Sequence, residues 1–367
     1  MNYIQDLEKI VKINSFTANK EGVDRVGSIF DEWLQSLGYS LELHERSVVG
    51  HHRHYRSSFK ENQKKLLLLG HLDTVFPPGE FENFHEDERW VYGAGVCDMK
   101  GGNIVFVEAL RRVFLKFHKI YNIDVLLVSD EETGSDDSKY LTRKIAKEYE
   151  YCFVYEAAGK KLELVTGRKG VGTFFIDIFG KAAHAGNHYL DGVDANLEAS
   201  YKLQNLVKLT DISKETTLNV GKIEGGIGAN TISPYAKLIF ELRYKTIEEK
   251  KRVLESIKDI VERNSVSKTE AKLSGGIQRD VMQTSEKSLQ LLKKINQITQ
   301  QNISYEERGG VSDANIISSE GVITLDGFGP FGDGDHTIKE RALKSSFESR
   351  IALSEALFEY FILHGEF

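Results

Sequence analysis

Two histidines and three carboxylates lie at points where an apolar run of the chain gives way to a loop or to a glycine-rich stretch. In chain order they are His71, Asp98, Glu132, Glu156 and His336. Two divalent metal ions that share one bridging carboxylate need about this ligand set: two histidines, two terminal carboxylates and one bridge. Glu131, which adjoins Glu132, is left as a carboxylate that could act as a general base. The residue types therefore predict a two-metal site with an adjacent base.

The first of these histidines follows an apolar run directly. His71 and Asp73 come after KLLLLG, and residues two apart in an extended chain face the same side. A metal-binding histidine is usually oriented by a second group on its other ring nitrogen. We therefore expect Asp73 to orient His71, although the same residues, taken alone, also fit a polar cap on the end of a strand.

Asp98 lies in a glycine-rich stretch, YGAGVCDMKGG. The pair Gly93 and Gly95 is typical of a dinucleotide-binding turn, but Asp98 stands where the third glycine of that motif should be. A carboxylate there would repel a pyrophosphate. We expect Asp98 to be the metal bridge, since the alternative of a simple turn residue does not explain the wider set.

The remaining candidates follow further apolar runs. Three consecutive carboxylates, Asp130, Glu131 and Glu132, come after IDVLLV, and a metal ion would relieve their repulsion. A solvated acidic loop before a helix is the alternative. Glu156 follows CFVY, and His336 lies in GDGDHTIKE. Each segment taken alone is only weak evidence for a metal ligand. Ligands gather outside the carboxyl ends of strands in open α/β sheets, which favours one common site.

Two other segments of the chain contain histidines. His51, His52 and His54 form HHRH beside several basic residues, and we expect a solvated polar loop without a metal. His184 lies among small residues in GKAAHAG, where its ring could donate a hydrogen bond to an oxyanion. A plain loop histidine fits that segment about as well.

The elements that would position these residues have α/β character. Helices are expected over 3–12, 22–37, 102–117 and 341–363, and apolar strands over 65–70 and 123–129, which is the order of a parallel sheet covered by helices. In the middle of the chain, between the strand at 123–129 and the helix at 341–363, four further strands are expected together with two helices. The strands are at 171–179, 216–223, 232–244 and 268–273, and the helices are at 193–209 and 247–263. This β-α-β-β-α-β order predicts a second domain over 170–277, inserted into a catalytic domain formed by 1–169 and 278–367.

Composition restricts the class of protein. The chain has 367 residues, a net charge of −7 and 40% hydrophobic residues, which fits two globular domains and argues against binding to nucleic-acid phosphates. Its two cysteines, Cys97 and Cys152, rule out a disulfide framework and favour a reducing compartment. We found no signal-peptide core and no apolar stretch of membrane-spanning length, so we expect a cytoplasmic protein.

Taken together, the motifs resemble those of the M20 co-catalytic zinc peptidases and amidohydrolases, a group that includes aminoacylase, acetylornithine deacetylase and succinyl-diaminopimelate desuccinylase. The resemblance rests on GHLDTV, GAGVCDMKGG, DEETGS, GKAAHAG and a late G-x-x-x-H-x-x-x-E, and it covers nearly the whole chain. It implies a zinc-exopeptidase-type catalytic domain with a mostly parallel sheet and an inserted ferredoxin-like lid or dimerisation domain. It also implies a homodimer and a cis peptide bond after Asp98.

The resemblance assigns roles to particular residues. It implies that His71, Asp98 and Glu156 bind one zinc ion, that Asp98, Glu132 and His336 bind the other, and that Glu131 is the general base, with cobalt or manganese as possible replacements. In several members the histidine that matches His184 completes the active site of the partner subunit. The positions linked to substrate contact are Asn230, Arg243, Gly309 and Gly310. Arg243 and Asn230 are expected to hold the terminal carboxylate of the substrate together, with Arg243 the better clamp.

The expected reaction is hydrolysis of an amide bond next to a free carboxylate, as in the glutamate carboxypeptidase branch. A deacylase of N-acyl amino acids and an aminopeptidase acting on dipeptides or tripeptides are alternatives with the same chemistry. One departure is Ala157, where the family commonly has proline after the ligand at 156. A non-catalytic regulator of the same fold is disfavoured by the complete ligand set and Glu131.

Overall fold

The computed structural model describes residues 3–367, which form two compact units. The first contains the chain up to Gly167 together with Thr284–Arg308 and Ser312–Phe367. The second contains Arg168–Gln283 and the distant tripeptide Gly309–Val311. The inserted segment was expected over 170–277. The second unit runs further because the backbones of Arg168 and Met282 exchange two hydrogen bonds, at 2.8 and 3.1 Å.

A six-stranded sheet forms the centre of the first unit, in the order β1-β2-β6-β3-β7-β14. Its strands are β1 (Ser40–His44), β2 (His52–Arg56), β3 (Leu66–His71), β6 (Ile123–Val128), β7 (Tyr151–Val154) and β14 (Ile323–Leu325). The last four strands of the sheet order are mutually parallel, whereas β1 and β2 form an antiparallel pair at one edge. Every residue of β3, β6 and β7 is buried, as expected for parallel strands covered on both faces. The predicted α/β class with a mostly parallel sheet is confirmed.

Helices pack against this sheet and against one another. They are α1 (Tyr3–Val11), α2 (Lys20–Gln35), α3 (Lys100–Phe117), α4 (Ser138–Ala146), α7 (Glu286–Thr299), α8 (Asp313–Ser319) and α9 (Lys344–His364). Helix α3 packs against both α1 and α9, while α4 packs against α8. The last helix begins three residues later than expected, because Arg341–Leu343 pairs as a strand, β16, with β5 (Trp90–Tyr92). Among residues 3–367, no helix combines the length and the apolar character that a membrane crossing requires.

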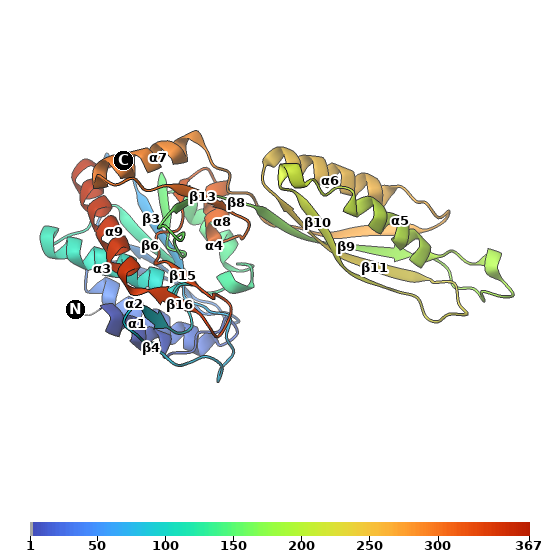
Figure 1. Cartoon of the computed structure of the whole chain (residues 1–367), viewed down its shortest axis with the longest axis horizontal. Helices are drawn as coiled ribbons and strands as arrows, with labels where there is room; N and C mark the ends of the chain where they lie inside the picture. The colour runs from blue at the N-terminus through green and yellow to red at the C-terminus, as the bar shows by residue number, and fades with distance from the viewer. Residues whose placement is uncertain (1–2) are drawn as a thin grey trace. The chain divides into compact units, whose positions relative to one another are not determined.

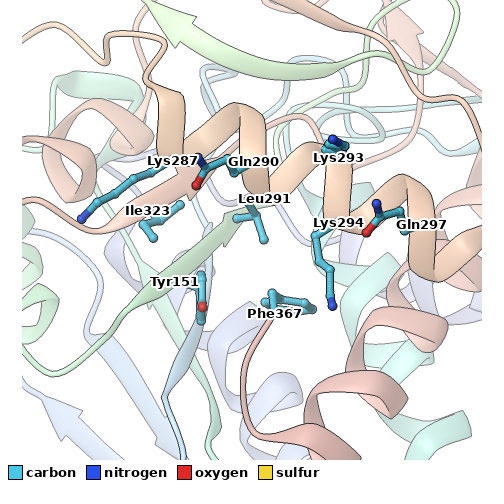
Figure 2. Close-up of a pocket in the computed structure, with 9 residues that line it drawn as sticks. All are labelled: Tyr151, Lys287, Gln290, Leu291, Lys293, Lys294, Gln297, Ile323 and Phe367. Atoms are coloured by element: carbon cyan, nitrogen blue, oxygen red, sulfur yellow. The ribbon is translucent and has the colours of Figure 1, made fainter.

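Smaller strands complete the first unit. β4 (His85–Glu86), β5, β16 and β15 (Gly332–Asp333) form a second sheet, and β8 (Leu164–Arg168) pairs with β13 (Tyr305–Arg308). A pocket of about 510 Å³ lies beside α7 and the carboxyl-terminal Phe367, with Tyr151, Leu291 and Ile323 in its wall (Figure 2). Its other lining side chains are lysines and glutamines, so it holds none of the candidate metal ligands.

The expectation that HHRH forms a solvated loop was wrong. His52, Arg53 and His54 are almost completely buried and belong to β2, an internal strand between β1 and β6. Their polar groups find partners far along the chain: Arg53 donates to Asp31 at 3.2 Å, and His54 contacts Tyr149 at 2.8 Å. These distant partners compensate for the burial of polar side chains, and a local sequence window cannot show them.

The second unit is an antiparallel four-stranded sheet with two helices. Its strands β9 (Gly170–Phe179), β10 (Thr217–Gly225), β11 (Tyr235–Tyr244) and β12 (Glu270–Arg279) lie in the order β10-β11-β9-β12. Helices α5 (Ala195–Val207) and α6 (Ile247–Glu262) contact each other and pack on the same sheet (Figure 1). Alternating burial along β11 explains this arrangement, since one face carries the apolar side chains. The order along the chain is β-α-β-β-α-β, as predicted.

Candidate metal centre

Three parallel strands bring the first candidates to one edge of the central sheet. His71 is the last residue of β3, Glu131 and Glu132 lie just after β6, and Glu156 lies two residues after β7. The register pairs His71 with Val128 and Leu69 with Val154, so the three strands end at nearly the same level. Side chains that follow these ends therefore meet outside the carboxyl edge of the sheet.

Asp98 reaches the same place from the turn before α3. The Asp98–Met99 peptide bond is cis, as the resemblance implied. The carboxylate of Glu340 accepts hydrogen bonds from the amides of Gly95 at 2.8 Å, Cys97 at 3.0 Å and Asp98 at 3.1 Å. Glu340 is 1% exposed, so it is a buried anchor for this turn. Sequence reasoning assigned it no role, although it is the final residue of G-x-x-x-H-x-x-x-E.

The two oxygens of Asp98 face two different groups of side chains. Oδ1 lies 3.3 Å from His71 Nε2, which is also 3.9 Å from Glu156 Oε1. Oδ2 lies 3.3 Å from His336 Nε2, which is also 3.1 Å from Glu132 Oε2. Two ligands of one tetrahedral zinc ion, each about 2.0–2.1 Å from it, are about 3.3–3.4 Å apart. The two distances from Asp98 to the histidine nitrogens, both 3.3 Å, match this spacing, while the distances from these nitrogens to Glu156 and Glu132 lie on either side of it. The donor set of imidazoles and carboxylates suits a divalent transition metal.

Hydrogen bonds fix the tautomer of His71. Its Nδ1 lies 3.0 Å from the backbone oxygen of Asp73, which can only accept, so the ring proton is on Nδ1 when the ring is neutral. The lone pair of Nε2 is then directed at Asp98. The carboxylate of Asp73 accepts from Thr17 Oγ1 at 2.7 Å and from the amides of Glu131 and Glu132 at 3.3 and 3.2 Å. Asp73 thus orients His71 through its carbonyl and holds the acidic turn through its carboxylate.

The cluster concentrates buried negative charge. Burial raises the pKa of Glu132 to about 8, and the charge of Asp98 acts in the same direction. Burial likewise raises the pKa of Glu156 well above its usual value. Hydrogen bonds to Asp98 and Glu132 raise the pKa of His336 to about 11. Like charges at close range cannot all ionise without a compensating cation, and a divalent metal ion could supply that compensation.

Glu131 lies beside this cluster without belonging to either ligand group. It is 9% exposed, and its charge contributes to the raised pKa values of both Glu132 and Glu156. Glu131 therefore lies close enough to the cluster to interact with both carboxylates electrostatically. That placement suits an acid–base group that acts on a water molecule or a substrate held there.

In the second unit, His184 and Asn230 lie together. His184 pairs with Thr231 in an isolated bridge, and the amide of Ala185 donates to the carbonyl of Asn230 at 2.9 Å. The amides of Gly186 and Asn187 both donate to His184 Nδ1, each at 3.1 Å. The proton of the neutral ring must then be on Nε2, so that exposed nitrogen is a hydrogen-bond donor.

Arg243 forms a separate group with the glycine pair. Its Nη1 donates to the carbonyl of Gly309 at 3.1 Å, and its Nε donates to Glu241 at 2.7 Å. Gly310 accepts from Arg168 Nη1 at 3.2 Å. Arg243 lies near one end of the ten-residue strand β11, and Asn230 precedes the other end. Eight residues of extended chain span about 27 Å, so Arg243 and Asn230 of one chain cannot hold the same carboxylate.

Comparison with known proteins agrees with this description of the fold and the motifs. The model of peptidase family M20/M25/M40 matches residues 67–360. Carboxypeptidase G2 of Pseudomonas sp. (strain RS-16) is 29% identical over 350 residues, which is 92% of this chain and 83% of that protein. Acetylornithine deacetylase of Vibrio campbellii (strain ATCC BAA-1116) is 27% identical over 263 residues, or 66% of this chain and 68% of that protein.

A solved structure gives the same fold over nearly the full length. Aminopeptidase PepT from Bacillus cereus ATCC 10987 superposes with a TM-score of 0.82 and 20% identity, covering 97% of each chain. The family model matches far more than half of the residues, including the segments that carry all the metal-ligand candidates. The chain therefore belongs to peptidase family M20/M25/M40 and is a metal-dependent hydrolase.

Proposed function

We propose that this hydrolase uses two zinc ions to cleave an amide bond next to a free carboxylate, most nearly as a glutamate-carboxypeptidase-like peptidase. The observation that carries the proposal is the position of Asp98, whose two oxygens are each 3.3 Å from a different histidine nitrogen. A carboxylate between two ligand groups is what a co-catalytic metal pair requires.

In this proposal His71, Asp98 and Glu156 would hold one ion, and Asp98, Glu132 and His336 would hold the other. When bound, the ions supply Lewis-acid chemistry, polarising the scissile carbonyl and making a water molecule more acidic. The anchor Glu340 keeps the bridging carboxylate in place, and Asp73 keeps the lone pair of His71 Nε2 directed at the site. Cobalt or manganese would satisfy the same donor set.

Glu131 performs the proton transfers. It accepts a proton from the attacking water as the new carbon–oxygen bond forms, and it delivers that proton to the leaving nitrogen as the carbon–nitrogen bond breaks. His184 contributes differently: its Nε2–H donates a hydrogen bond to the oxyanion of the tetrahedral intermediate. The amides that donate to its Nδ1 support this role because they hold the proton on the outer nitrogen.

Substrate contacts in the proposal come from two chains. Arg243 and the Asn230–His184 group lie at opposite ends of one sheet, so a substrate that touches both groups must lie between protomers. We therefore propose a homodimer formed through the inserted unit, with Arg243, Gly309 and Gly310 binding the free carboxylate of the substrate. The Nη groups of Arg243 suit a carboxylate, although Glu241 also binds the guanidinium.

We also propose a cytoplasmic location for the protein. The free thiols of Cys97 and Cys152 suit a reducing compartment.

The class of substrate distinguishes the proposed carboxypeptidase from the two alternatives, a deacylase of N-acyl amino acids and a di- or tripeptidase. The name carboxypeptidase G2 favours a peptidase, whereas acetylornithine deacetylase, a similar relative, favours removal of an acyl group. The test is amine release from N-acyl-glutamates, other N-acyl amino acids, dipeptides and tripeptides, using chelator-stripped protein reloaded with zinc. We expect turnover of the N-acyl-glutamates by wild type and none by Glu131→Gln. Turnover confined to substrates with a free amine would instead identify a di- or tripeptidase.

A further inference from the structure

The β1–β2 hairpin carries a second group of potential metal ligands, which shares no residue with the cluster around Asp98. Glu42 and His44 are two residues apart in β1, so their side chains face the same side of the sheet. The antiparallel register places His54 of β2 directly opposite Glu42. Directly opposed residues project on the same face, so one glutamate and two histidines converge there.

The donor atoms of this trio are close enough to share one ion. His44 Nε2 lies 3.6 Å from Glu42 Oε1, and His54 Nδ1 lies 3.7 Å from Glu42 Oε2. One donor atom from each of the three residues lies within 4.8 Å of the other two. Ligands of a tetrahedral zinc ion are about 3.3–3.4 Å apart, so small side-chain rotations would complete the geometry.

A hydrogen-bond relay directs the lone pair of His54 at Glu42. Tyr149 Oη donates to the carboxylate of Asp124 at 2.7 Å, so it must accept from His54 Nε2, which lies 2.8 Å away. The proton of the His54 ring is therefore on Nε2, and Nδ1 carries a free lone pair. Metal-binding histidines typically donate their other N–H in this way to a carboxylate, a carbonyl or a similar outer group.

The nitrogens that face Glu42 lack hydrogen bonds. His44 Nε2 and His54 Nδ1 are both inaccessible to solvent and have no hydrogen-bond partner, and the His54 side chain is 0% exposed. A buried polar atom without a partner is costly. Burial also lowers the pKa of both imidazoles, that of His54 to about 4, so both rings are neutral near pH 7 and can bind a cation.

We propose that Glu42, His44 and His54 bind a further divalent transition-metal ion, and that zinc is the best match. Two imidazoles and one carboxylate form a known three-ligand zinc set, in which water takes the fourth position. Calcium and magnesium prefer oxygen ligands and do not suit this trio. Arg56 Nε lies 3.3 Å from Glu42 Oε2, which leaves Oε1, on the side of His44, as the better ligand atom. The ion would clamp β1 to β2 at the edge of the central sheet.

The test is the zinc content of the full-length protein at a low free zinc concentration set by a chelator buffer, measured by mass spectrometry. The informative variant is the double substitution Glu42→Gln with His44→Gln, because both side chains are partly exposed and neither fills the core. We expect wild type to hold one more zinc ion per chain than this variant. Equal zinc contents would overturn the proposal, whatever the number of ions bound around Asp98.

Glu148→Gln is the matched control. Glu148 is the other carboxylate bound by Arg56, with contacts of 2.7 and 3.1 Å, and it is not one of the ligands. We expect this variant to keep the wild-type zinc content. Loss of the same ion in Glu148→Gln would show that the Arg56 network, rather than direct ligation, governs binding, and would overturn the ligand assignment.

NMR of the histidine rings gives a second readout that does not depend on activity. Zinc should move the ring nitrogen signals of His44 and His54 in wild type and in Glu131→Gln. It should leave the His54 signals in place in the Glu42→Gln, His44→Gln variant. Ring signals that do not respond to zinc in wild type would also overturn the proposal.

Discussion

The carboxylate of Glu340 accepts a hydrogen bond from the backbone amide of Asp98 at 3.1 Å, and the same carboxylate accepts from two further amides of that turn. A glutamine at this position keeps one acceptor oxygen but turns an NH₂ group toward the donors. We expect Glu340→Gln to lower metal affinity or turnover by about 10–100-fold, as for other residues that support metal ligands. Metal titration and turnover with saturating zinc would measure the two effects.

The control for this substitution is Glu348→Gln. Glu348 is an exposed carboxylate of α9 that pairs with Arg112 and does not contact the Asp98 turn. It should leave metal affinity and turnover unchanged. A Glu340→Gln protein with wild-type zinc affinity and rate would show that the turn keeps its shape without the buried anchor.

Glu131→Gln should separate catalysis from metal binding. Glutamine preserves the size of the side chain but cannot take a proton from water, so we expect turnover to fall by about 10²–10⁴. Zinc content should stay at the wild-type level, because Glu131 belongs to neither ligand group. Glu132→Gln is the matched comparison, since it should lose zinc as well as activity. Wild-type rates in Glu131→Gln would remove this residue from the mechanism.

His184→Ala should lower turnover by about 10²–10³, the usual effect of deleting an oxyanion donor. Mixed dimers then reveal which active site the histidine serves. If it acts across the dimer, refolding Glu131→Gln together with His184→Ala restores one intact site in each mixed dimer, or about one quarter of wild-type activity for random pairing. If it acts within its own chain, every mixed dimer has two defective sites and the mixture stays inactive.

Glu249 gives the inserted unit a pH-dependent contribution to stability. Hydrogen bonds from Arg252, the largest cause, hold the pKa of Glu249 at about 2 in the folded protein. Because this value is below the unfolded value of about 4.3, the stabilisation is fully present above pH 4.3 and disappears as the pH falls toward 2. Glu249→Gln should cost on the order of 1–3 kcal/mol at neutral pH.

Thermal unfolding across this pH range measures that contribution. The difference in Tm between wild type and Glu249→Gln should shrink as the pH falls from about 4.3 to 2. The neighbouring Glu248 is exposed, so Glu248→Gln should match wild type throughout. If the difference in Tm between wild type and Glu249→Gln does not change with pH, the charge of the Glu249 carboxylate is not what stabilises α6.

The sequence predicted the parts of the fold that depend on the local pattern of apolar residues. Runs such as LLLL at 66–69 and VLLV at 125–128 are fully buried in parallel strands, and the β-α-β-β-α-β order is recovered with ends shifted by a few residues. HHRH was misread because its polar composition hides a strand. Only the folded chain shows that Arg53 meets Asp31 and that His54 meets Tyr149.

In the candidate site, too, the sequence predicted what depends on local segments and missed what depends on distant partners. All five metal-ligand candidates converge, because strand ends and glycine-rich turns are visible in the sequence. The expectation that Asn230 and Arg243 hold one carboxylate overlooked the strand between them, although the apolar alternation of 236–244 could have revealed the separation. The anchoring role of Glu340 was missed because its partners are backbone amides, whose positions no residue type encodes.

The tripeptide Gly309–Val311 bears on how separable the inserted unit is. It belongs to that unit although residues of the first unit flank it on both sides, and Gly309 accepts a hydrogen bond from Arg243. Transplanting Arg168–Gln283 into another protein would therefore leave a piece of the unit behind. During synthesis on the ribosome, the four strands of the inserted sheet emerge before this tripeptide. The loop that joins Arg243 can dock only after α7 and β13 have also been made.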